Sequence, residues 1–451
     1  MNILYLRPEE QLIHEIAQSR DEGKSVEDID RAWNSPATQG LDASLLRESA
    51  LELLDKLRLR PKDPQLALEE PSDLGEIRGR SGIDALRMPG SPMIKEDVLD
   101  RIHGGWLGRA AGCLLGKPVE KAGRRGIREM LQAAKRWPLA DYFSGFGVPS
   151  ELLATYPWNR HGGWESLKEN IKCMPEDDDL NYPIVNLIVA ERFGSGFTSE
   201  QVAQTWLETL PALATYTAER VAYVNCLKQI PVPDTAIINN PYREWIGAQI
   251  RADLWGWIAC GNPVVASEYA WRDARLSHVR NGIYGEMFFA AAIAEAGHCQ
   301  DIEQILRTAL MVVPAKSRFA QAVEFAMKTA HEQVAWENVV DRLERKFEKL
   351  YWVHTLNNAS LVVAALIHGR GDFERTICAA VMGGWDADCN GATAGSVLGT
   401  MLGARRLPEK WIKPLNNCLR SSVAGFDNSA FDQLARRTCA LQETFVADRS
   451  K

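Results

Sequence analysis

Residues 383–391 read Gly-Gly-Trp-Asp-Ala-Asp-Cys-Asn-Gly, and this glycine-rich turn carries two aspartates one residue apart, Asp386 and Asp388. The segment that follows is rich in small side chains and continues a series of glycines at every fourth position from Gly391 to Gly403. In an α-helix this spacing aligns the glycines along one ridge. Because an interior glycine costs roughly 1 kcal/mol relative to alanine, the ridge indicates close approach of another helix.

A second glycine series lies far upstream, in residues 103–116. Its members are Gly104, Gly108, Gly112 and Gly116. Pro118 disfavours further helix, which places Glu120 just past the helix end. We predict that the two glycine-ridged helices pack at the centre of the fold and bring Glu120 to the Asp386/Asp388 turn. Two unrelated helices with small faces are the alternative, which spacing alone leaves open.

The composition is that of an ordinary soluble globular protein. The chain has 451 residues, of which 46% are hydrophobic and 25% charged, and one large domain or two smaller ones would fit. A net charge of −7 gives no reason to expect nucleic-acid binding. No apolar run reaches the roughly 18 residues that a membrane helix needs, and the first residues lack the blocks of a signal peptide. The nine cysteines form no CxxC pair, so we expect a cytoplasmic protein with reduced thiols.

Two parts of the chain are expected from the pattern of apolar residues. The pattern of residues 1–95 predicts a helical N-terminal extension without a catalytic constellation, and a lid or an oligomer contact are its alternative roles. Residues 96–451 predict the catalytic domain, and because strand alternation is absent from the sequence, the predicted fold class is all-α. Residues 411–440 are expected to form two helices that close the domain. The polar and aromatic loops at 141–163 and 239–253 are expected to line a site.

Four consecutive carboxylates, from Glu176 to Asp179, lead into an apolar run. Acidic residues are favoured in the first turn of a helix by its exposed N–H groups and macrodipole, so helix capping is one interpretation. Four carboxylates exceed what capping needs, and their repulsion favours bound cations. An oxygen-rich set suited to a pair of Mg²⁺ or Mn²⁺ ions is formed by Glu176, Asp177, Asp178, Asp386, Asp388 and a nearby Glu120. Two separate acidic surface features are the alternative.

Other motifs exclude some functions and suggest weaker candidates. Residues 386–391 match the first half of an EF-hand loop, but the twelfth position, which needs a glutamate, holds Val397. The sequence contains no GxxxxGK[ST] phosphate loop and no Gly-x-Ser-x-Gly elbow. Four polar residues are weaker candidates for substrate contacts: Arg251, His278, Asn281 and Asn358. His278 could equally be a helix-end histidine satisfied by a carbonyl.

These motifs, in this order, resemble the ADP-ribosylglycohydrolase family over roughly residues 97–404. The family's glycine-rich helix ending in Gly-x-x-x-Glu is matched by residues 108–120, and its Thr-Asp-Asp-Thr motif by residues 176–179. Its Ser/Thr-His pair is similar to Ser277-His278, and its Gly-Gly-Asp-x-Asp-Thr-x-Gly-Ala signature to residues 384–392. The resemblance is to members like the dinitrogenase reductase-activating glycohydrolase, in a bacterial-type subgroup with an N-terminal extension.

The resemblance implies an all-α domain with a central cleft that holds two Mg²⁺ ions, with Mn²⁺ as the alternative. It implies metal ligands at Glu176, Asp177, Asp178, Asp386, Asp388 and Cys389. Catalytic roles are implied for Asp177, Asp386 and Glu120, the last as acid/base or as the residue that positions the leaving group. A metal-activated water would attack the anomeric carbon of an N- or O-ribosyl bond, in an ADP-ribosylated side chain or a small nucleoside-like metabolite.

Two positions depart from the family motifs. Glu176 replaces a ligating threonine and adds a charge, and Cys389 replaces another with a soft ligand that suits Mg²⁺ poorly. Cys389 therefore favours an alternative function, a catalytically weakened ADP-ribose-binding or structural protein on the same scaffold. The intact Asp386/Asp388 pair favours the hydrolase. The sequence leaves the anomer and oligomerisation open.

Overall fold

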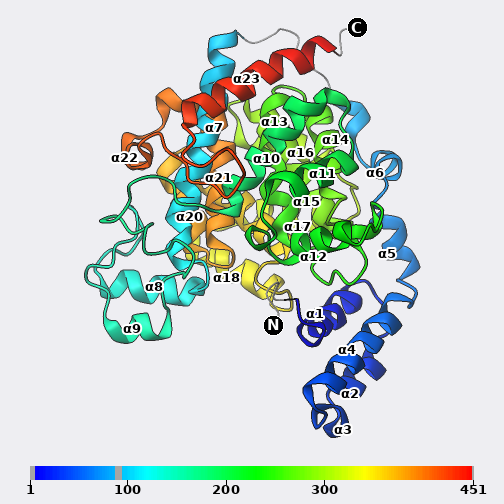
Figure 1. The fold of residues 1–451 in the computed structure, drawn as a ribbon. Helices are drawn as coiled ribbons and strands as arrows, with labels where there is room; N and C mark the ends of the chain where they lie inside the picture. The colour runs from blue at the N-terminus through cyan, green and yellow to red at the C-terminus, as the bar shows by residue number, and fades with distance from the viewer. Residues whose placement is uncertain (1–5, 87–93, 449–451) are drawn as a thin grey trace.

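The computed structural model describes residues 6–86 and 94–448, and every regular element in them is a helix (Figure 1). The all-α prediction is therefore confirmed. Among these residues, no helix is long and apolar enough to cross a membrane.

The helices follow one another along the chain in this order. The N-terminal helices are α1 (Pro8–Asp21), α2 (Glu27–Trp33), α3 (Pro36–Gln39), α4 (Ala43–Arg58), α5 (Pro64–Glu69) and α6 (Leu74–Arg80). The next are α7 (Lys95–Gly116), α8 (Gly123–Ala133), α9 (Ser150–Thr155), α10 (Asp178–Phe193), α11 (Ser199–Thr209), α12 (Thr217–Leu227), α13 (Ala252–Ile258), α14 (Pro263–Ala274), α15 (Asn281–Ala296) and α16 (Ile302–Leu310). The last are α17 (Arg318–Glu332), α18 (Trp336–Lys346), α19 (Thr355–Gly369), α20 (Phe373–Met382), α21 (Ala387–Leu402), α22 (Glu409–Ile412) and α23 (Phe431–Asp448).

The two glycine ridges lie against each other in α7 and α21, which run side by side through the molecule (Figure 1). A Cβ atom added at Gly108 would lie less than 3.0 Å from the Gly395 carbonyl oxygen, and one at Gly112 would lie as close to that of Gly391. Residues later in α7 thus contact residues earlier in α21, so the two helices are antiparallel. The predicted central pair is confirmed, and glycine is what lets the two backbones touch.

The helix α15 lies in the core beside this pair. All of its residues are buried, and α13, α14, α16 and α19 pack around it. Its sequence is apolar on nearly every side, which is the pattern of a helix that other helices surround.

The prediction of two helices over residues 411–440 is partly wrong. The short α22 and the long α23 are separated by a largely irregular segment. Asn416 and Asn417 both have positive φ, 49° and 50°, a left-handed conformation that asparagine tolerates and a continuing helix excludes. The chain therefore leaves the helical path soon after α22.

The N-terminal extension has a small apolar core of its own, and α2, α3 and α4 project from the main body (Figure 1). That core consists of Leu12, Ile16, Val26, Ile29, Trp33, Ala50, Leu53, Leu54 and Leu57. Buried ion pairs join α1 to the main body, because Arg243 donates to Glu15 at 2.6 Å and to Glu22 at 2.9 Å. The extension is thus fixed against the 239–253 loop. A domain boundary at residue 95 stays a prediction.

Candidate metal centre

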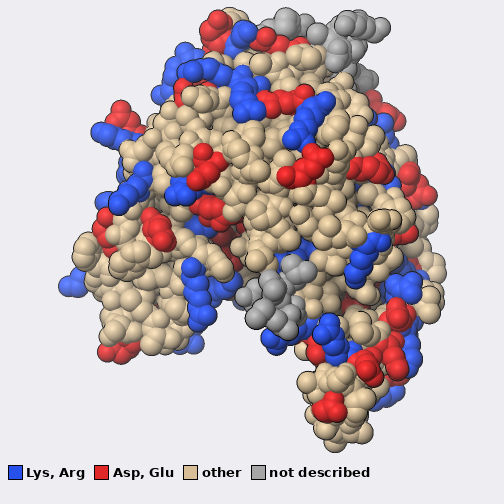
Figure 2. All heavy atoms as spheres, in the orientation of Figure 1, with Lys and Arg blue, Asp and Glu red and all other residues tan. Residues whose placement is uncertain are grey.

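A cavity of about 370 Å³ lies where the α7–α8 junction, the acidic run and the N-terminus of α21 meet. Figure 2 shows the molecular surface notched between the lobe that holds α8 and α9 and the N-terminal extension. The cavity is lined by each residue implied above as a metal ligand or catalytic group: Glu120, Glu176, Asp177, Asp178, Asp386, Asp388 and Cys389. The structure therefore brings three separated motifs to one place.

Both loops that were expected to line a site contribute to this cavity. Residues 141–163 supply Asn159 and His161. Residues 239–253 supply Tyr242, Trp245, Ile246, Gly247 and Ile250. The composition of the loops was thus a sound guide to their position.

Glu120, Asp386 and Asp388 form a close group of carboxylates in the cavity. One ligand oxygen from each lies within 4.8 Å of the others, and the two aspartates are only 5% and 6% exposed. Asn159 donates to Glu120 at 2.5 Å and fixes that carboxylate. Asp386 and Asp388 have no salt-bridge partner among the residues that the structure describes. Glu120 is half-buried, and its only salt-bridge partner in the described part of the chain is the largely exposed Lys121, at 3.9 Å. Carboxylates with so little compensating charge are suited to a hard metal ion.

Burial and mutual repulsion both raise the pKa values of the aspartates in this group. Burial, followed by the neighbouring Glu120 and Asp177, raises the pKa of Asp388 to about 8. Burial and the neighbouring Asp388 raise the pKa of Asp386 as well. A cation among these oxygens would stabilise their charged form and reverse both shifts.

The turn before α21 aims these aspartates. Gly384 and Trp385 both have positive φ, 76° and 51°, and the turn so formed ends at Asp386, the N-cap position of α21. The side-chain oxygen of Asn358 accepts from the Asp386 N–H at 3.2 Å and from the Asn390 amide at 2.8 Å. Asn358 therefore acts as the support of the turn.

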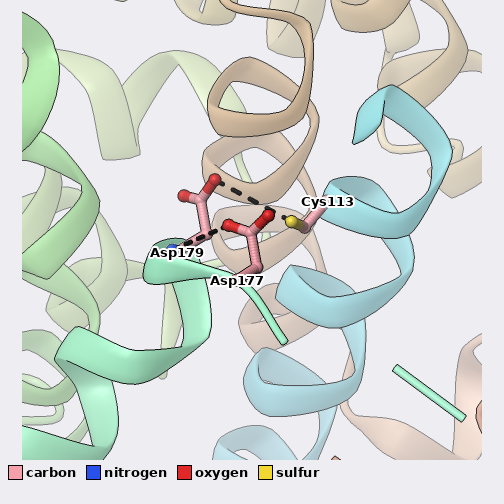
Figure 3. Close-up of side chains that lie close together, drawn as sticks. All are labelled: Cys113, Asp177 and Asp179. Atoms are coloured by element: carbon pink, nitrogen blue, oxygen red, sulfur yellow. Dashed lines mark hydrogen bonds between the residues drawn. The ribbon is translucent and has the colours of Figure 1, made fainter. Parts of the chain in front are cut away.

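A second acidic group lies deeper, between α7 and the start of α10 (Figure 3). It contains Asp177, Asp179 and Cys113, whose ligand atoms also lie within 4.8 Å of one another. Asp177 caps α10 by accepting from the Asp179 N–H at 2.9 Å. The Cys113 thiol donates to Asp179 at 3.8 Å.

Basic side chains on α7 and just after it neutralise this second group, and sequence analysis missed them. The Lys117 ammonium pairs with Asp177. Arg109 is fully buried and pairs with Asp179 at 2.6 Å and with Asp253 at 2.8 Å. Burial alone would raise the pKa of Asp177, but Lys117 holds it below its ordinary value. Arg109, Cys113 and Lys117 follow at four-residue spacing, which places them on one helix face, and that spacing was the available signal.

The remaining predicted ligands lie at the cavity wall. Glu176 accepts from Asn181 at 2.8 Å and from the Ser422 hydroxyl at 2.7 Å, so the irregular segment before α23 holds it in place. Asp178 is half-buried, and burial together with Asp177 raises its pKa. Burial raises the pKa of the Cys389 thiol, and a protonated thiol is a weak ligand for Mg²⁺.

Arg251 and His278, predicted as substrate contacts, lie behind the cavity wall and have no exposed surface. Arg251 donates to Glu219 at 3.0 Å, to Asp273 at 3.2 Å and to the Ser277 hydroxyl at 2.8 Å. His278 shares a hydrogen bond with the same hydroxyl at 2.8 Å. Of this buried cluster, only Glu219 lines the cavity.

Asn281 and Asn358, the other two predicted contacts, are also buried and committed to protein partners. Asn281 donates to Glu70 at 2.9 Å and to Glu244 at 2.6 Å, at the junction with the extension. Asn358 supports the turn before α21, as described above. Neither residue lines the cavity, so we correct all four contacts to supporting positions, because each side chain spends its hydrogen bonds on buried neighbours.

Several residues that line the cavity belong to no sequence motif. They include His14, Tyr216, Glu219, Tyr351 and Trp352. Isolated aromatic residues occur throughout any chain, and only tertiary packing shows which of them share a cavity.

Comparison with known proteins gives a family match over most of the chain. A family model described as ADP-ribosylglycohydrolase matches residues 94–446. A solved structure described as an ADP-ribosylglycohydrolase-related protein complex is 19% identical, covers 78% of this chain and 99% of its own, and superposes with a TM-score of 0.49. No curated protein matches the chain.

Proposed function

Because the chain belongs to the ADP-ribosylglycohydrolase family, we propose that it is a cation-dependent hydrolase of an N- or O-ribosyl bond. Family membership supports glycoside hydrolysis of this general kind. The observation that carries the proposal is the close group of Glu120, Asp386 and Asp388 in the cavity, in which both aspartates are buried. These residues would hold a Mg²⁺ or Mn²⁺ ion, which supplies Lewis-acid chemistry and lowers the pKa of water.

The residues of the chain supply binding and charge for this reaction. Bond cleavage at an anomeric carbon passes through a cation-like transition state. The carboxylates of this group give a negative potential that stabilises the developing positive charge. Asn159 holds Glu120 in one orientation, so that this carboxylate can position the leaving group or exchange a proton with it. The hydrogen bond from the Asp386 N–H to Asn358 holds Asp386 in place beside Glu120.

The variant Asp386→Asn tests the proposal. We expect cation-dependent release of ribose or ADP-ribose from a panel of nucleosides and ADP-ribosyl compounds, measured by chromatography with Mg²⁺, Mn²⁺ or a chelator. Asp386→Asn should lower kcat roughly a hundredfold or more, because it removes a charge that both cation and transition state need. It should also weaken Mn²⁺ binding in calorimetry.

The matched control is Asp432→Asn, an aspartate outside the cavity that pairs with Arg436 at 2.7 Å on the surface. This variant should behave as the wild type. A wild-type protein that neither turns over any ribosyl compound nor binds Mn²⁺ would contradict the proposal and favour the weakened binding or structural protein.

We further propose one tightly held cation in place of the two that the resemblance implies. Asp177, an expected ligand, is already engaged by Lys117 and by the α10 backbone, and the pairing supports a single ion at the Glu120 group. Mass spectrometry of metal content after dialysis against Mn²⁺ should give one ion per chain. In Lys117→Met we expect two, because Asp177 becomes available.

Lys121→Met is the control for this count, since Lys121 also lines the cavity but is largely exposed. It should leave the count at one. Two ions in the wild type would refute the single-cation proposal without affecting the proposed reaction.

A further inference from the structure

The N-terminal extension lies outside the matched residues 94–446, yet it supplies part of the cavity lining. Leu6 and His14 both line the cavity. His14 projects from α1, the helix that buried ion pairs join to the main body. The extension is therefore part of the substrate cavity.

His14 belongs to a continuous group of rings, called here the aromatic wall: His14, Tyr242, Trp245 and Tyr351. The His14 ring lies edge-on to Trp245 at 5.1 Å and to Tyr351 at 5.0 Å between centroids, and at 5.4 Å from Tyr242. Trp245 and Tyr351 are stacked at 4.8 Å. All four rings line the cavity.

Hydrogen bonds fix the two sides of the wall to each other. Arg243, next to Tyr242, donates to Glu15, next to His14, at 2.6 Å. Gln18 of α1 donates at 2.8 Å to Glu244, which precedes Trp245. Because these bonds are buried, the wall is preorganised and does not need to be assembled by a ligand.

Within the wall, Tyr351 keeps aromatic surface available. Tyr351 retains 46% of its surface, whereas Tyr242 and Trp245 are only 8% and 7% exposed. Tyr216, which also lines the cavity, retains 38%. Large rings that stay exposed beside a polar cavity favour stacking with a planar ligand group.

The charged side chains that line the cavity indicate which kind of ligand would carry this planar group. Its lysine and arginine side chains are Lys117, Lys121 and Arg220. Lys117 pairs with Asp177, Lys121 lies 3.9 Å from Glu120, and Arg220 donates to the carbonyls of Leu213 and Thr215. With each cation already engaged by the protein, the lining favours an uncharged ligand over a diphosphate.

Resting on the proposed function, we propose that the aromatic wall receives the planar base of a ribonucleoside, with the sugar toward Glu120, Asp386 and Asp388. His14 then makes the extension a determinant of substrate choice. In the reaction, the bond between C1′ and the base nitrogen breaks, and the oxygen of a water molecule bonds to C1′. A proton of that water goes to the base, so ribose and free base are released.

Calorimetry with a C-nucleoside analogue of adenosine tests this inference without turnover, because its carbon–carbon glycosidic bond resists the hydrolysis. The full chain with Mg²⁺ is compared with Tyr351→Ala and His14→Ala. We expect each variant to bind the analogue about tenfold more weakly, the usual effect of losing one stacked ring. Phe146→Ala, a 68% exposed ring outside the cavity, is the control and should bind as the wild type.

ADP-ribose serves as the second probe and should bind no more tightly than the analogue. The inference is overturned if the wild type does not bind the analogue, if both wall variants bind it unchanged, or if ADP-ribose binds more than tenfold tighter. Wall-dependent binding without hydrolysis of any riboside would instead overturn the proposed function and retain the wall, so the two failures are distinguishable.

Discussion

The substitution Gly112→Ala is expected to destabilise the protein by about 3 kcal/mol or more, although alanine is the better helix former by roughly 1 kcal/mol. The sign reverses because the added Cβ would lie within 3.0 Å of the Gly391 carbonyl group. That obstacle is backbone and cannot rotate away, so α7 and α21 must separate. Separation would disturb the cavity lining as well, since Glu120 follows α7 and Asp388 lies in the first turn of α21.

Urea denaturation followed by circular dichroism measures this effect, with the variant's midpoint expected far below that of the wild type. Gly79→Ala in α6 is the control, because a Cβ at Gly79 meets nothing within 4 Å. That change should be neutral or slightly stabilising. If Gly112→Ala unfolds at the wild-type midpoint, the close packing of the glycine ridges is refuted.

The central helix pair and the acidic group could be predicted because each rests on a local rule. Four-residue spacing fixes one helix face regardless of what lies elsewhere in the chain. The spacing of Gly104, Gly108 and Gly112 therefore predicts a close contact with another helix, whichever segment supplies that helix. The position of Glu120 then followed from Pro118, which ends the helix.

The four expected substrate contacts could not be placed correctly, because burial is a property of the whole fold. Arg251 and His278 have the chemistry of substrate-binding residues, yet both are enclosed by carboxylates and hydroxyls from other helices. Their partners, such as Glu219 and Asp273, carry no spacing that links them to Arg251. A buried ion cluster and a binding site use the same residue types, and sequence alone does not separate them.

The role of the extension was missed for a related reason. His14 and Tyr351 are more than three hundred positions apart in the sequence, and neither belongs to a motif. Their contact depends on how α1 docks. Docking depends in turn on ion pairs whose partners are equally distant in the chain, such as Glu22 and Arg243.

Glu22→Gln is expected to lower the free energy of unfolding by about 3 kcal/mol at neutral pH. Glu22 has no exposed surface and accepts from Arg243 at 2.9 Å, with Lys24 at 3.4 Å and Arg280 at 3.7 Å. Burial alone would raise its pKa, but Arg243 and Lys62 lower it from 4.5 to about 2. This lowering of the pKa also corresponds to about 3 kcal/mol of folding free energy that the charged form of Glu22 contributes.

The pH dependence of this effect has a definite sign. Because the folded-state pKa is depressed, the contribution of Glu22 is present above pH 4.5 and is lost as the pH falls toward 2. Urea denaturation of wild type and Glu22→Gln over this range should give a stability difference that is largest near neutrality and closes in acid. Contributions of groups that do not interact with Glu22 cancel, since both proteins contain them.

Asp28→Asn separates burial from pairing as the cause of the Glu22 effect. Asp28 also lies in the extension, and a hydrogen bond from Arg60 lowers its pKa to about 2, but the carboxylate faces solvent. Water screens an exposed pair, so this variant should unfold close to the wild type at every pH. Equal losses in the two variants, or a loss in Glu22→Gln that does not change with pH, would contradict the argument. A large and pH-dependent loss confined to Glu22→Gln would mean that buried charge holds α1, and with it His14, against the cavity.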